Sequence, residues 1–101
     1  MSIKAGVRVL GVRPEIVLAI GVARAVYTQL GVGADFVVTS VMEGTHSRAS
    51  IHYSGGAADL RRPRVQAEQV AATLKEQLGD DFDVILENDH IHCEFQPKAP
   101  Y

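Results

Sequence analysis

The segment from His90 to Phe95, HIHCEF, carries two imidazoles and a carboxylate at alternate positions. In a β-strand, side chains two residues apart share one face, so His90, His92 and Glu94 are expected to lie together. The intervening apolar side chains then face a hydrophobic core, and Cys93 among them is expected to be a small buried side chain. The polar face is left for a cleft, and two imidazoles so close together indicate that this face binds something.

A second polar segment, from His52 to Asp59, has the pattern H-x-x-G-x-A-x-D. Gly55 and Gly56 allow the positive φ angles that would fold the segment back and bring His52 and Asp59 together. With His92 they make two imidazoles and one carboxylate, which together with a water is the ligand set of catalytic zinc. Zinc lowers the pKa of such a water to about 7 and makes it a nucleophile. We therefore predict a Zn²⁺ site formed by His52, Asp59 and His92.

Water activation also needs a proton acceptor, and two acidic residues come shortly before His92. Asp89 precedes it by three residues and Glu87 by five. A carboxylate at this turn could take a proton from the water and pass it to the leaving amine. Both residues are therefore candidate general bases.

Taken together, these motifs are similar to the signature of a family of zinc peptidases. The pattern from His52 to Asp59, the later carboxylate and the H-x-H strand resemble the D-Ala-D-Ala carboxypeptidases, the D-Ala-D-Ala dipeptidases and the phage L-alanyl-D-glutamate endopeptidases. Residues 44–53 (GTHSRASIHY) and 90–93 (HIHC) also resemble the Hedgehog signalling domain, which shares the fold and the zinc site. The resemblance covers about residues 36–96.

The resemblance implies a zinc-dependent peptidase that hydrolyses peptidoglycan stem peptides. It implies His52, Asp59 and His92 as the zinc ligands. The peptidases place the general base three residues before the last histidine, which implies Asp89. Hedgehog places a glutamate further upstream, which implies Glu87, and we prefer the peptidase assignment.

One position departs from the peptidase pattern. The family carries an arginine in a T-S-G-x-R-type loop, where it steadies the developing oxyanion, whereas the segment TSVME has Glu43 there. Arg48 and His90 are candidates for that role. Because Hedgehog also lacks the arginine, the alternative function is a non-catalytic zinc domain that stabilises the fold or forms a partner-binding surface. A third hypothesis is a metal-free binding module with chance histidines.

The apolar spacing predicts the elements that position these residues. Two amphipathic helices are expected, one over residues 14–30 and one from Pro63 to Leu78. Four strands are expected, at residues 36–41, 57–60, 82–86 and 90–95. The last two are expected to form a hairpin around a turn at 87–89. This order predicts an α+β domain in which both helices cover one face of a mainly antiparallel sheet. The chain of 101 residues is expected to be a single domain.

The composition excludes several partners. A net charge of -2 argues against general nucleic-acid binding. No apolar run is long enough to span a membrane, and the N-terminal residues do not have the pattern of a signal peptide. We therefore expect cytoplasmic synthesis, with phage machinery or lysis delivering the protein if its target is a cell wall. A basic cluster of Arg61, Arg62 and Arg64 is interpreted mainly as a solvated surface, and the oligomeric state stays open.

Overall fold

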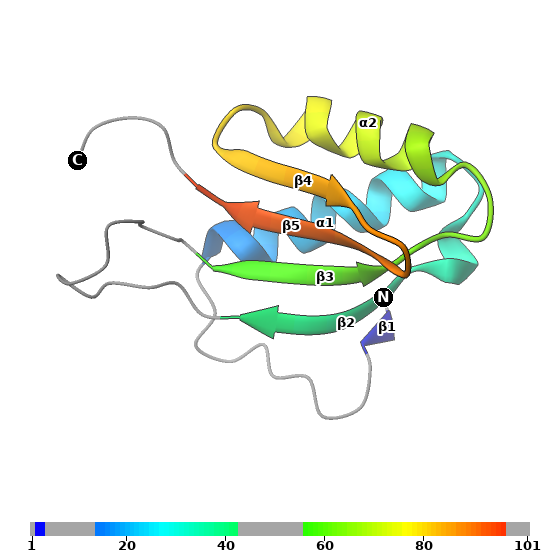
Figure 1. Ribbon diagram of the computed structural model, residues 1–101, viewed down its shortest axis with the longest axis horizontal. Coiled ribbons are helices and arrows are strands. Elements are labelled where there is room, and N and C mark those ends of the chain that lie inside the picture. Colours follow the sequence, from blue (N-terminus) through cyan, green and yellow to red (C-terminus); the bar gives the residue numbers. More distant parts are fainter. Residues whose placement is uncertain (1, 4–13, 43–55, 97–101) are drawn as a thin grey trace, which may run out of the picture.

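The computed structural model describes residues 2–3, 14–42 and 56–96 and has an α+β fold (Figure 1). Two helices cover a sheet of four antiparallel strands, to which a short parallel strand is added at one edge. Along the chain the elements are β1 (Ser2–Ile3), α1 (Pro14–Gln29), the 3-10 turn η1 (Gly33–Asp35), β2 (Val37–Met42), β3 (Ala57–Arg61), α2 (Ala67–Leu78), β4 (Phe82–Leu86) and β5 (His90–Phe95). The strand order in the sheet is β1-β2-β3-β5-β4. The predicted fold class and all four predicted strands are confirmed, with strand ends shifted by at most one residue.

Helix α1 forms as its apolar spacing predicts. Pro14 is its first residue, where a missing N–H costs no hydrogen bond. Its buried stripe runs from Ile16 to Tyr27 at helical spacing. Gly31 follows the end with a φ of 77°, a conformation that favours glycine.

Helix α2 begins at Ala67, so the prediction that Pro63 opens it is wrong. The reason is local: Gln66 has a φ of 60°, which interrupts a right-handed helix, and its side-chain amide donates to the carbonyl of Leu30 at 2.9 Å. The backbone N–H of Arg64 donates to the Asp35 carboxylate at 3.0 Å, and its guanidinium adds a bond at 3.1 Å. These two hydrogen bonds hold the pKa of Asp35 below its usual value.

The core lies between the helices and one face of the sheet. Ala58 and Leu60 on β3 pair with Cys93 and Ile91 on β5, and all four side chains are buried. They pack with the inner stripes of both helices, so α1 and α2 cover the same face (Figure 1). Asp59, between Ala58 and Leu60, therefore points to the opposite face.

Among the described residues, no helix is long and apolar enough to cross a membrane.

One hydrogen bond joins α1 to the end of β3. The hydroxyl of Tyr27, a fully buried residue, donates to the carbonyl of Arg61 at 2.7 Å. Burial raises the pKa of Tyr27 well above its usual value, so the hydroxyl keeps its proton. The Tyr27 ring also meets Phe36 edge-on at 5.1 Å between centroids. Tyr27 thus fixes the helix against the strand that carries Asp59.

We expect Tyr27→Phe to lower the free energy of unfolding by about 1 kcal/mol, because the ring contact stays and the hydrogen bond is lost. Urea unfolding of the two proteins measures the difference. Thr28→Val is the matched control, since it removes an exposed hydroxyl that donates to Arg24 within the same helix. That control should change the stability by no more than about 0.5 kcal/mol. Equal losses in the two variants would show that the Tyr27 hydroxyl has no special role.

Candidate metal centre

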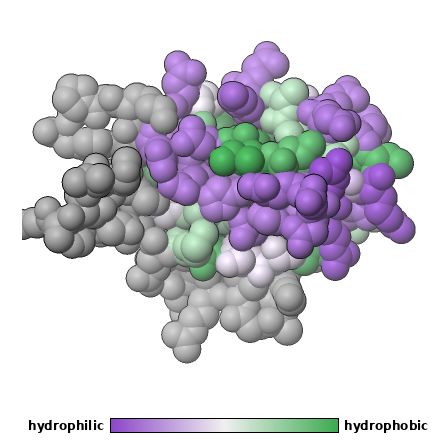
Figure 2. All heavy atoms as spheres, viewed as in Figure 1, coloured by the Kyte–Doolittle hydropathy of each residue, from purple (hydrophilic) through white to green (hydrophobic). Residues whose placement is uncertain are grey.

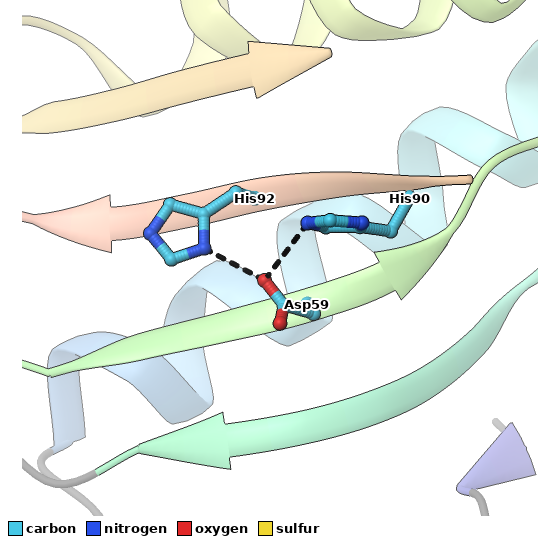
Figure 3. A group of neighbouring side chains, drawn as sticks. All are labelled: Asp59, His90 and His92. Atoms are coloured by element: carbon cyan, nitrogen blue, oxygen red, sulfur yellow. Dashed lines mark hydrogen bonds and ion pairs between the residues drawn. The ribbon is translucent and has the colours of Figure 1, made fainter. Parts of the chain in front are cut away.

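Asp59 lies in the middle of β3, directly opposite His92 of β5 (Figure 3). On its other side, β2 has an irregular register between Val38 and Ser40, and the hydroxyl of Thr39 donates to the Asp59 carbonyl at 3.2 Å. Such bulges bend a strand and reorient its side chains, and they are frequent beside functional sites. The backbone of Asp59 is thus fixed from both neighbouring strands.

Two imidazoles converge on one oxygen of Asp59. Oδ1 lies 2.7 Å from Nδ1 of His92 and 3.8 Å from Nε2 of His90 (Figure 3). One ligand atom from each of the three residues lies within 4.8 Å of the others, close enough to bind a metal ion. Tetrahedral zinc, with bonds of about 2.0–2.2 Å, places its ligand atoms roughly 3.4 Å apart. The two distances from Oδ1 of Asp59 lie on either side of that value.

Each imidazole has a second carboxylate at its other nitrogen. Oε1 of Glu94 lies 3.0 Å from Nε2 of His92, and Oδ1 of Asp89 lies 2.6 Å from Nδ1 of His90. The other carboxylate oxygen of Glu94 accepts a hydrogen bond from the side-chain amide of Gln96. The site is therefore a continuous row of polar contacts, Gln96–Glu94–His92–Asp59–His90–Asp89.

His92 has a carboxylate oxygen at both ring nitrogens, whereas a neutral imidazole has only one N–H. Burial alone would lower the pKa of His92. The hydrogen bonds between its ring and the carboxylates of Glu94 and Asp59, together with the negative charges of these carboxylates, outweigh burial, so the pKa of His92 is raised. Without metal, a proton on His92 thus satisfies both carboxylates. A metal cation between Nδ1 and Asp59 would satisfy the same charges.

The cluster lies on the face of the sheet that the helices leave uncovered. The side chains of Asp59 and His92 are 22% and 18% exposed, and that of His90 is 32% exposed. Figure 2 shows this side of the molecule, where hydrophilic side chains predominate and a hydrophobic strip crosses the upper part. Ile85 of β4, directly opposite His92, contributes an exposed apolar side chain beside the site. The donors are therefore half-buried and within reach of a ligand.

The structure brings together Asp59 and His92, as the sequence predicts, and adds His90 to them. The sequence predicts an oxyanion-stabilising role for His90, and its period-two spacing from His92 is the signal that could have placed it among the donors. Asp89 contacts His90 and not Asp59. At Glu87, the backbone N–H donates to the His90 carbonyl at 2.8 Å. The predicted ligand His52, the departure at Glu43 and the candidate Arg48 lie outside the described residues.

Two further interpretations concern residues beside the site. Cys93 is buried on the core face, as predicted, and burial raises its pKa to about 12, so its thiol stays protonated. Within the basic cluster, Arg62 donates to the carbonyl of Glu87 at 2.9 Å, and Arg64 pairs with Asp35 at 3.0 Å. Arg62 thus joins the segment after β3 to the β4–β5 turn, and Arg64 joins the segment before α2 to η1.

Comparison of the chain with models of protein families, with curated proteins and with solved structures gave no match. The resemblance to the zinc peptidases therefore stays a prediction from the motifs.

The raised pKa of His92 predicts how the metal-free protein responds to pH. The protonated His92 side chain contributes its full stabilisation at pH values below its pKa in the unfolded chain, which is about 6.5. This stabilisation is lost as the pH rises through the higher pKa of His92 in the folded protein. With a chelator present, the stability advantage of the parent over His92→Gln should therefore shrink as the pH rises above about 6.5. Urea unfolding at several pH values measures this advantage. An advantage that grows with pH would contradict the assigned protonation.

Proposed function

We propose that the protein is a zinc-binding domain whose metal is held by Asp59, His90 and His92. The observation that carries this is the Asp59 carboxylate, which faces an imidazole nitrogen of each histidine at 2.7 and 3.8 Å. Two imidazoles and one carboxylate favour zinc over magnesium and calcium, which prefer oxygen ligands only. The half-buried position on an uncovered sheet face supports the same conclusion, because a metal could enter there.

The reaction that this site supports best is hydrolysis of a peptide bond, with peptidoglycan stem peptides as the substrate class that the sequence motifs imply. Zinc would supply Lewis-acid polarisation of the scissile carbonyl and an activated water. The chain itself supplies the proton acceptor, for which Asp89 and Glu87 of the β4–β5 turn are the candidates. The hydrogen bond from His90 lowers the pKa of Asp89, so this carboxylate stays ionised but is a weaker proton acceptor than an ordinary aspartate.

A second candidate function is a zinc domain without catalysis, and the position of His90 favours it. Catalytic zinc keeps one position open, whereas structural zinc has four protein ligands. If His52 joins Asp59, His90 and His92, the ligand set is closed. The metal would then stabilise the fold or shape a binding surface.

Purified protein loaded with zinc and freed of excess metal should contain one equivalent of zinc by elemental analysis. We expect Asp59→Ala to lose this equivalent, because it removes the oxygen between the two imidazoles. Asp80→Asn, which removes an exposed carboxylate from another turn, is the control and should retain the metal. A parent protein without bound zinc, or an Asp59→Ala variant with a full equivalent, would rule out this site.

The zinc-loaded parent should release peptide fragments from muropeptides, detected by mass spectrometry. At saturating zinc, the double variant Glu87→Ala/Asp89→Ala should lower kcat by about 100-fold or more, because general-base catalysis contributes that much. Equal rates in parent and variant would exclude both carboxylates as the base. A zinc-loaded parent without activity on wall peptides, whose melting temperature falls sharply on chelation, would favour the structural role.

A further inference from the structure

The two histidines of the site present different ring nitrogens to Asp59. His90 approaches Asp59 with Nε2 and meets Asp89 with Nδ1. His92 approaches Asp59 with Nδ1 and meets Glu94 with Nε2. Each imidazole is thus held between an inner carboxylate, shared by both rings, and an outer carboxylate of its own.

We propose that Asp89 and Glu94 are positioning residues that fix His90 and His92 in opposite tautomers, so that Nε2 of one and Nδ1 of the other bind the metal beside Asp59. The proposal rests on the metal site described above and assigns the coordinating atoms and their supporting groups.

The chemistry of imidazole determines these tautomers. A ring nitrogen that binds metal carries no proton, so the proton of the neutral ring must be on the other nitrogen. At His90 that proton is on Nδ1, where it donates to Asp89. At His92 it is on Nε2, where it donates to Glu94. The outer carboxylates also make the inner nitrogens more basic and hold the ring planes in place.

The surroundings of the outer carboxylates support this role. Glu94 is itself hydrogen-bonded by Gln96, and its side chain is 23% exposed, so its orientation is fixed. Asp89 is 88% exposed and reaches the site through its 2.6 Å contact with His90. Under this assignment Asp89 acts on the metal through His90, and Glu87 remains as the candidate for proton transfer.

The test uses the full chain, loaded with zinc and labelled with ¹⁵N. Long-range ¹H–¹⁵N correlation spectra distinguish the protonated from the metal-bound nitrogen of each imidazole, and His90→Gln and His92→Gln assign the signals. We expect protonated Nδ1 with bound Nε2 at His90, and the reverse at His92. The same tautomer at both histidines, or a His90 ring without bound metal, would overturn the proposal.

Zinc affinity, measured by competition with a chromophoric chelator, provides the second arm. Asp89→Asn and Glu94→Gln should each weaken zinc binding by about 10- to 100-fold, the usual effect of losing such a supporting carboxylate. Asp80→Asn controls for the change in charge and should bind as the parent does, and circular dichroism checks that each variant is folded.

The outcomes separate this inference from the metal site itself. Zinc bound by the parent and lost in Asp59→Ala, with unchanged affinity in Asp89→Asn and Glu94→Gln, would overturn the positioning role alone. A parent that binds no zinc would overturn the metal site and this inference together.

Discussion

The pairing of β3 with β5 is the constraint on which the site depends, because it places Asp59 directly opposite His92. A shift of one residue would turn Asp59 toward the helices and bury its carboxylate in the core. The alternation of side chains prevents this, since Ala58 and Leu60 on β3 and Ile91 and Cys93 on β5 are all buried on the helix side. The packing of apolar side chains therefore determines where the polar ones meet.

The meeting of polar groups produces an excess of negative charge. Three carboxylates, those of Asp59, Asp89 and Glu94, surround two imidazoles within one row of contacts. A proton on His92 offsets one of these charges, which is why its pKa is raised. A divalent cation beside Asp59 would offset two of these negative charges. Each imidazole would then keep one ring proton, which it could donate to Asp89 or to Glu94. Protonation of His92 and binding of a cation are thus two ways to offset the same negative charge.

Much of this could be predicted from the sequence, because alternation in a strand and spacing in a helix are local properties. Period two placed His90, His92 and Glu94 on one face and Cys93 in the core, as the structure has them. The start of α2 was not predictable in this way, since it depends on the left-handed Gln66 and on a carboxylate at position 35, far away in the sequence. The pairing of Asp89 with His90 also depends on a side-chain rotamer within the hairpin, which no periodicity specifies.

The same geometry relates the two candidate functions through the number of protein donors. Asp59, His90 and His92 leave a tetrahedral metal one position for water, as hydrolysis needs. The sequence predicts His52 as a ligand too, and a fourth protein donor would fill that position. If His52 is a ligand as well, a catalytic site needs either His90 or His52 to stay off the metal, whereas a structural site can retain both. The two proposed roles thus differ in whether one more imidazole joins the donors on this sheet face.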